Sequence, residues 1–219
     1  MQDSYIINLK NISFAYDNRP LLFQNLNFSL PHNGRVGITG PNGCGKTTLF
    51  YLIMGFVGPT SGEIEIFGKI RKKEKDFKEV REKIGFLFQN SDDQLFCPSV
   101  KEEVAFGPLN YRIPKDEVEK RVKESLSLVG LEGFEERPPY HLSEGEKKRL
   151  AIATILTLNP EIILLDEPTN GIDPAGVKKI EEILKTGKFS YIIISQDIDF
   201  LKRTTDKLYT IREGKILTV

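Results

Sequence analysis

Apolar and polar residues alternate along the first thirty positions of the chain, with the two-residue period of a strand that buries one face. The alternation runs over residues 5–16 and resumes over residues 22–30. Asp17, Asn18 and Pro20, which favour turns, separate the two runs. We therefore expect an antiparallel hairpin at the start of the chain.

Farther along, short apolar runs alternate with segments of helical character, which is the order of an α/β protein. The expected strands span residues 35–39, 63–67, 84–88, 162–166 and 191–195. The expected helices span residues 46–54, 114–130, 175–185 and 199–203. A closing hairpin over residues 207–219 is expected to turn at Glu213 and Gly214.

The longest of these helices has the clearest pattern. Val118, Val122 and Leu126 recur at four-residue steps and mark one apolar face. Pro114 suits the first turn of the helix, and Gly130 suits its C-terminal cap.

This helix belongs to a stretch, residues 91–158, that is helical in character and lies between core strands. We expect a single domain over residues 1–219. Residues 1–90 and 159–219 would form its core, and residues 91–158 an inserted helical subdomain.

One glycine-rich segment points to phosphate binding. Residues 40–48 read GPNGCGKTT and fill every fixed position of the GxxxxGK(S/T) loop, between an expected strand and an expected helix. Backbone N–H groups of such a loop surround a phosphate, and the helix dipole adds to the attraction. We expect Lys46 to meet the β- and γ-phosphates and Thr47 to offer a hydroxyl to Mg²⁺. A glycine-rich turn that binds nothing would not explain the Lys-Thr pair.

Two carboxylates follow an apolar strand at residues 162–165. Asp166 and Glu167 stand at the edge of the sheet where ligands gather in open α/β proteins. Adjacent strand residues point to opposite sides, so we expect Asp166 to hold Mg²⁺ and Glu167 to polarise water. An acidic pair that merely caps a strand is the alternative, and the phosphate loop upstream disfavours it.

Composition narrows the function further. The chain of 219 residues carries 31 basic and 31 acidic side chains, so no basic field argues for nucleic acid. Its apolar runs are too short to cross a bilayer. Residues 1–4 lack a secretion-signal pattern and the two cysteines, Cys44 and Cys97, lie far apart, so we expect a reduced cytoplasmic setting. A redox role for Cys44 is the alternative to an ordinary loop residue. The charged stretch 69–83 is expected to be a solvated face.

The order of these motifs resembles that of an ABC-type ATPase. The matching segments are residues 40–48 (Walker A), Gln89 (Q-loop), 142–146 (signature), 162–167 (Walker B) and 170–174 (D-loop). The resemblance implies the ABC ATPase fold, an α/β P-loop NTPase in which a mostly parallel core sheet carries an antiparallel β subdomain and an inserted helical subdomain. It also implies ATP and Mg²⁺ as ligands.

The same resemblance assigns roles to individual residues. Tyr16 would stack on adenine, Gln89 would link metal and water to the helical subdomain, and Glu167 would be the catalytic base. The metal-binding set would be Thr47, Gln89 and Asp166. The remaining nucleotide-binding residues would be Asn42, Gly43, Cys44, Gly45, Lys46 and Thr48.

The signature segment has a physical logic of its own. Ser143 and Glu146 have the spacing of a capping box at the start of a helix. In the family this end faces the γ-phosphate held by a second subunit, and Ser143 and the Gly145 N–H would donate to it. The chain departs from the family by having Glu144 in place of glycine and Glu146 in place of glutamine.

A narrower resemblance comes from residues 85–96 and 100–108, which are similar to the ATPase subunits of energy-coupling-factor importers of metal ions and vitamins. In those subunits this region receives a transmembrane coupling protein, which would hold the chain at the inner face of the cell membrane. Leu95 and Phe96 would belong to that surface, or would pack the helical subdomain. The resemblance implies a dimer of ATPase subunits, identical or different. It leaves open the transported substrate, a regulatory subunit with little turnover, and a soluble ABC ATPase.

One expected residue is replaced. The family places a histidine after the strand at residues 191–195, where it contacts the γ-phosphate and holds the attacking water. This chain has Gln196 there. An amide can hydrogen-bond to phosphate and water but cannot titrate near neutrality, so we expect ATP binding to survive better than hydrolysis. Glu167, Gln89, Gln196 and Lys46 are the expected catalytic residues.

Overall fold

The computed structural model describes residues 5–219, which form two compact units. The first unit runs to Ile84 and resumes over Phe189–Val219, and the second spans Gly85–Lys188. Residues 1–4, whose composition entered the expectation of a cytoplasmic setting, lie outside the described residues.

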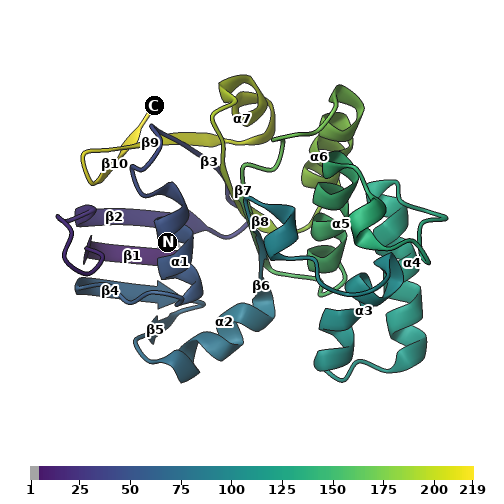
Figure 1. Ribbon diagram of the computed structural model, residues 1–219. Coiled ribbons are helices and arrows are strands. Elements are labelled where there is room, and N and C mark those ends of the chain that lie inside the picture. Colours follow the sequence, from purple (N-terminus) through teal and green to yellow (C-terminus); the bar gives the residue numbers. More distant parts are fainter. Residues whose placement is uncertain (1–4) are drawn as a thin grey trace. The chain divides into compact units, whose positions relative to one another are not determined.

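The first unit contains a four-stranded antiparallel sheet (Figure 1). Its strands, in the order β2-β1-β4-β5, are β2 (Phe23–Pro31), β1 (Tyr5–Phe14), β4 (Ser61–Ile66) and β5 (Lys69–Arg71). Ile7 and Leu9 are buried two residues apart, as the period of a strand requires. A register shift after Leu9 brings Ile12, three residues later, into the core as well. The predicted hairpin is therefore confirmed, and the strand expected at 63–67 begins two residues earlier.

The rest of the first unit is built around β3 (Arg35–Thr39), which leads into the glycine-rich loop and helix α1 (Lys46–Met54). Strand β3 pairs in parallel with β8 (Ser190–Ile194) and with β9 (Lys207–Arg212). Helix α7 (Ile198–Thr204) connects β8 to β9, and β10 (Lys215–Thr218) closes the predicted hairpin. Glu213 and Gly214 both have positive φ, 50° and 72°, as the expected tight turn demands.

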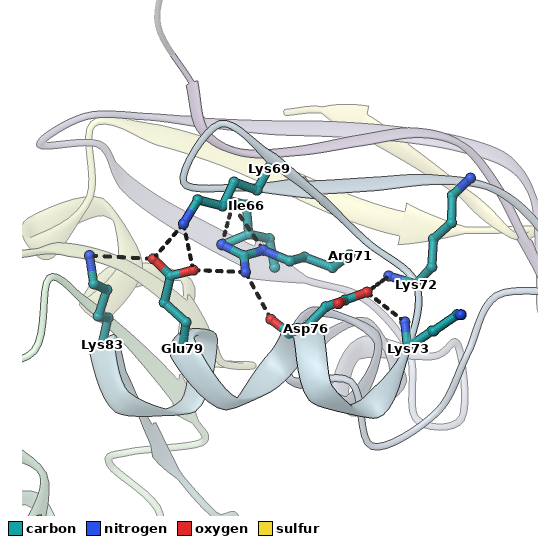
Figure 2. Close-up of polar contacts among 8 residues, drawn as sticks. All are labelled: Ile66, Lys69, Arg71, Lys72, Lys73, Asp76, Glu79 and Lys83. Carbon is teal, nitrogen blue, oxygen red and sulfur yellow. Dashed lines mark hydrogen bonds and ion pairs between the residues drawn. The ribbon is translucent and has the colours of Figure 1, made fainter.

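The charged stretch 69–83 is more structured than a solvated face. It forms β5, the 3₁₀ turn η1 (Glu74–Phe77) and helix α2 (Lys78–Lys83). Arg71 is only 5% exposed, and Figure 2 shows its guanidinium between the carbonyl of Ile66, the carbonyl of Asp76 and the carboxylate of Glu79. Most lysines of the stretch are exposed, as expected. Arg71, however, is buried and hydrogen-bonds the stretch to the end of β4.

The second unit is mainly helical. Helices α3 (Val100–Asn110), α4 (Lys115–Val129), α5 (Glu144–Leu156) and α6 (Pro174–Thr186) pack against one another (Figure 1). The short turns η2 (Ser91–Asp93) and η3 (Pro139–His141) connect them, and β6 (Ile84–Leu87) and β7 (Ile162–Asp166) are neighbouring strands. The long helix has its apolar face buried and ends at Gly130, with φ 68°, as predicted. Pro114 precedes its first turn instead of lying in it.

The helices of the described residues are short. The longest, α4, has 15 residues and carries charges along its length, whereas about 20 apolar residues are needed to cross the hydrocarbon core. Within residues 5–219, no helix combines the length and the apolar character of a membrane span.

Candidate functional site

The glycine-rich loop has the backbone geometry of an anion cradle. Gly40, Gly43 and Gly45 all have positive φ, 146°, 77° and 104°, which turns successive N–H groups inward. A Cβ at Gly45 would lie 2.7 Å from the ring of Phe23, so only glycine fits there. Helix α1 begins at Lys46, and its N-cap Gly45 has no side chain to occupy the first N–H groups of the helix. The positive end of the helix is thus presented to the loop.

Lys46 lies folded against this loop. The side chain is 8% exposed, and Nζ donates to the carbonyls of Gly40 at 2.8 Å and of Pro41 at 3.1 Å. These two bonds hold the ammonium above the N–H groups of the loop. An ammonium has three N–H donors, so one remains for a phosphate oxygen.

Tyr16 is hydrogen-bonded to helix α1. Its hydroxyl and the Thr48 hydroxyl are 3.1 Å apart, and its ring stands edge-on to Phe14 with the centroids 4.8 Å apart. The side chain is 37% exposed, so one part of the ring remains open to solvent. Its contact with an adenine stays a prediction.

Gln196 also reaches the loop. Its Nε2 donates to Oδ1 of Asn42 at 2.6 Å, which ties the end of β8 to the loop inside the first unit. Both side chains line a cavity of about 380 Å³, together with Thr39, Gly40, Thr210 and Arg212. The residue at the position where the resemblance expects a histidine therefore lies beside the phosphate loop. Its contact with the γ-phosphate stays a prediction.

In the second unit, the acidic pair stands at the end of β7. Asp166 is the last residue of this strand and is 1% exposed. Glu167 is 6% exposed and lies outside the strand, in the left-handed region with φ 48°. Because Glu167 lies past the end of the strand, the alternation of strand side chains does not set the direction of its carboxylate.

The signature end forms the predicted capping box. Ser143 Oγ accepts from the Glu146 N–H at 3.3 Å, while Glu146 Oε2 accepts from the Ser143 N–H and hydroxyl, both at 2.8 Å. The Ser143 N–H holds the pKa of Glu146 below its usual value of 4.5. The single hydroxyl hydrogen of Ser143 thus points to Glu146, and Glu144 pairs with Lys147 at 3.2 Å.

Helix α5 also grips the segment that follows β6, and the sequence analysis did not foresee this. Lys148 is 3% exposed and donates to the carbonyls of Phe88 at 3.3 Å and Gln89 at 2.5 Å. A lysine among the apolar positions of a helix was a signal in the sequence that this side chain is buried. The sequence could not identify its partners, because they lie some 60 residues away.

An exposed apolar surface follows the same segment. Phe96 is 67% exposed and stands edge-on to Phe106 with centroids 4.8 Å apart, while Leu95 is half-buried. The buried carboxylate of Glu103 accepts from the N–H groups of Phe96 and Cys97, at 2.8 and 2.6 Å, and so fixes this part of the chain. Burial, aided by Glu103, raises the pKa of the Cys97 thiol to about 11. A hollow of about 780 Å³ lies between α3 and α4, lined by residues such as Phe106, Leu109 and Val118.

Comparison of the sequence with known proteins gives consistent matches. Residues 23–170 match the family model described as ABC transporter. The chain is 50% identical over 218 residues to the energy-coupling factor transporter ATP-binding protein EcfA of Methanocaldococcus jannaschii, which covers 97% of this chain and 78% of the relative. EcfA of Methanococcus maripaludis is 43% identical over 216 residues, with the same coverage.

Solved structures agree with these relatives. The structure of cbiO1 from Clostridium perfringens, part of the ABC transporter complex cbiONQ, is similar with a TM-score of 0.88 and 36% identity, over 97% of this chain and 87% of the other. An ATP-binding cassette solved as a dimer in a post-hydrolysis state with ADP and Pi is similar with a TM-score of 0.86 and 28% identity, over 96% of both chains.

Proposed function

Because the chain belongs to the ABC transporter family, among the energy-coupling factor ATP-binding proteins, we propose that it is the ATP-hydrolysing subunit of an importer for a metal ion or a vitamin. The observation that carries the proposal is the loop at residues 40–48. Its three left-handed glycines, the α1 N-terminus and Lys46 form a cradle for a polyphosphate.

The donor groups of the chain fit a magnesium nucleotide. Thr47 supplies a hydroxyl and Asp166 a buried carboxylate, and Mg²⁺ in phosphate sites is held by few protein oxygens together with substrate phosphates. Among residues 5–219, no group of three or more His, Cys, Asp or Glu side chains is placed to hold a metal ion. We therefore do not propose a metal site made only of protein ligands. When bound, Mg²⁺ neutralises charge on the β- and γ-phosphates.

The hydrolysis itself is assigned to four side chains. Lys46 holds the γ-phosphate, Glu167 takes the proton of the attacking water, and Gln89 and Gln196 orient that water. Asn42, Gly43, Cys44, Gly45 and Thr48 complete the contacts of the loop, and Tyr16 carries the adenine. The burial of Glu167 supports its assignment as the base, because a side chain that is only 6% exposed is protected from bulk water.

The active form is proposed to be a head-to-tail dimer. Ser143 and Gly145 of one subunit donate to the γ-phosphate held by the phosphate loop of the other, and ATP closes the dimer. Gly145 suits this role because its backbone lies at the exposed start of α5, inside the first helical turn. Related cassettes that were solved as dimers support the proposal.

The second partner is proposed to be a transmembrane coupling protein, which keeps the chain at the inner face of the membrane. The surface offered to it is formed by Phe96, Phe106 and Leu109, which are 67%, 45% and 48% exposed, beside the hollow between α3 and α4. Exposed aromatic and aliphatic side chains around a hollow suit an amphipathic helix. The neutral net charge gives no support for a nucleic-acid partner.

A second candidate is a nucleotide-binding regulatory subunit with weak turnover. Two observations favour it: the amide of Gln196 is already bonded to Asn42, and the hydroxyl of Ser143 is already bonded to Glu146. Each bond occupies a group that hydrolysis would use. The two candidates differ in turnover, not in ATP binding.

The test compares nucleotide binding and steady-state hydrolysis of the purified chain with those of Lys46→Ala and Glu167→Gln. Lys46→Ala should lose tight ATP binding, because a phosphate partner is gone. Glu167→Gln should keep binding, lower turnover by about 10²–10⁴-fold and accumulate an ATP-bound dimer in sedimentation. A Glu167→Gln variant as fast as the parent would refute the assignment of the base, and a parent with ATP binding but no turnover would favour the regulatory subunit.

A further inference from the structure

The second unit contains a buried lysine whose contacts bracket a single residue. Lys148 lies on α5, five residues after the helix N-cap Ser143, and it is 3% exposed. Its ammonium donates to the carbonyl of Phe88 and to the carbonyl of Gln89. These two carbonyls belong to the peptide planes on either side of the Gln89 Cα. Because each peptide is planar, holding both fixes φ and ψ of Gln89 and the direction in which its side chain leaves the backbone.

A second side chain, that of Gln94, connects the segment around Gln89 to α5. Gln94 accepts from the N–H of Phe88 at 3.3 Å through Oε1, and its Nε2 donates to the carbonyl of Ala151 and the hydroxyl of Thr154, both at 2.9 Å. Ala151 and Thr154 lie on α5 near Lys148. The helix that begins with the signature therefore holds three backbone groups near Gln89. The Phe88 N–H is held through Gln94, and the carbonyls of Phe88 and Gln89 are held by Lys148.

The energetics argue that this lysine is not simply a packing residue. Burial of an ammonium is unfavourable unless its donors are satisfied, and an apolar side chain of similar length would fill the space at lower cost. Burial lowers the pKa of Lys148, against the opposing field of Asp166, Glu144 and Glu167. The positive charge thus lies in the field of the acidic pair at the end of β7, within the same unit.

We propose that Lys148 is a positioning residue of the ATPase reaction, which sets the orientation of Gln89 relative to the signature helix. The inference rests on the proposed function, since it requires Gln89 to act in hydrolysis. Lys148 acts through the Gln89 backbone, which its two hydrogen bonds hold. Its loss should leave ATP binding to the phosphate loop intact and slow the chemical step.

The test pairs Lys148→Met with Arg149→Met. Arg149 is the next residue on α5, and its guanidinium also donates to two backbone carbonyls, those of Val129 and Gly130, at 3.1 and 3.4 Å. Both variants remove a cation that caps carbonyls, so both should lower the melting temperature. Only Lys148→Met should lower kcat, by about 10- to 100-fold, with the KM for MgATP changed by less than about threefold. Lys148→Gln, which keeps an N–H donor, should recover part of the lost kcat.

Hydrogen–deuterium exchange of a peptide covering residues 88–94 gives a readout that does not depend on turnover. Exchange there should be faster in Lys148→Met than in the parent and unchanged in Arg149→Met. Equal kcat values for the two methionine variants, or equal exchange, would overturn the inference. If Lys148→Met does not fold, kcat and exchange of Lys148→Gln are compared with those of Arg149→Met, and the same outcomes decide. A parent without ATPase activity would refute the proposed function instead, and the exchange measurement would still report whether Lys148 holds Gln89.

Discussion

Gln196 illustrates how a single side chain is set by its immediate neighbours. It follows β8, and its Nε2 donates to Asn42 of the phosphate loop at 2.6 Å. The family histidine at this position would have a ring nitrogen that can donate or accept. The amide in this chain is oriented toward a loop side chain, which limits what it can offer to a phosphate.

Gln196→His should therefore raise ATP turnover and leave ATP affinity nearly unchanged. A missing transition-state donor costs about 10²–10³ in rate, and glutamine is a partial substitute, so the gain should be smaller than that. Steady-state kcat and equilibrium ATP binding of the variant and the parent provide the check. A variant slower than the parent would show that the site is built around glutamine.

At the scale of elements, the start of α5 is stabilised by one carboxylate. Glu146 accepts from the Ser143 N–H and hydroxyl, and its pKa lies below 4.5 because the Ser143 N–H favours the charged form. A group whose pKa is depressed in the folded state contributes stability above the pKa of its unfolded state, and loses it as the pH falls through the folded value. The signature helix should therefore be sensitive to acid below about pH 4.5.

Glu146→Gln should remove this contribution. At pH 7 we expect the free energy of unfolding to fall by about 0.3–1 kcal/mol, since a negative charge at a helix N-terminus is lost. As the pH is lowered below 4.5 the parent and the variant should converge in melting temperature. Glu136→Gln, which alters an exposed carboxylate outside the helix, is the control. A constant difference between pH 3 and pH 7 would contradict the assignment.

The segment after β5 is held by a single buried guanidinium. Arg71 donates to Ile66 O at 3.2 and 3.0 Å, to Asp76 O at 2.8 Å and to Glu79 at 3.0 Å (Figure 2). The planar fork of arginine reaches all three partners at once, and lysine cannot. Lys69, also bonded to Glu79, is 63% exposed and adds little.

Arg71→Met should lower the free energy of unfolding by about 1–3 kcal/mol, because two buried carbonyls lose their donor. Lys69→Met should change it by less than about 0.5 kcal/mol. Denaturant unfolding of the two variants measures both values. ATP affinity should stay at the parent level in each, and equal stabilities would mean that the guanidinium is not the fastener of η1 and α2.

At the scale of the whole molecule, the proposed function requires the chain both to hydrolyse ATP and to act on a partner. The surface proposed for that partner includes Phe96, and Leu95 lies next to it in the sequence. Both residues follow the segment held by Lys148 and Gln94. Glu103 fixes this surface through two backbone N–H groups. Gln89, the residues that hold it and the exposed aromatic pair all lie in one compact unit.

Replacing Leu95 and Phe96 by Ser should leave dimerisation and ATP hydrolysis of the isolated chain unchanged. The same change should weaken binding of the membrane partner by about tenfold or more. Leu128→Ser, at a 48%-exposed position on α4, is the matched control and should bind the partner like the parent. Co-purification with the partner and transport in vesicles are the measurements. Loss of the fold would show that the half-buried Leu95 is a core residue, in which case Phe96→Ser alone decides.

The sequence alone determined the features that depend on neighbours along the chain. The two-residue and helical periods placed most strands and helices, but not β5, α2 or α3. The loop at residues 40–48 and the Ser143 cap were predicted with their residues, because each is formed by a continuous segment. The order of motifs also identified the family. Roles that the resemblance assigns, such as that of Tyr16, stay predictions.

Only the tertiary structure decided how side chains far apart in sequence meet. Lys148 reaches carbonyls 59 and 60 residues away, Gln196 reaches Asn42 across 154 residues, and Glu167 leaves its strand with a left-handed φ. Arg71 is buried within a stretch that its composition marks as solvated. Periodicity reports which face of an element is apolar, whereas a buried charge is positioned by the backbone groups that satisfy it, and packing alone brings those groups together.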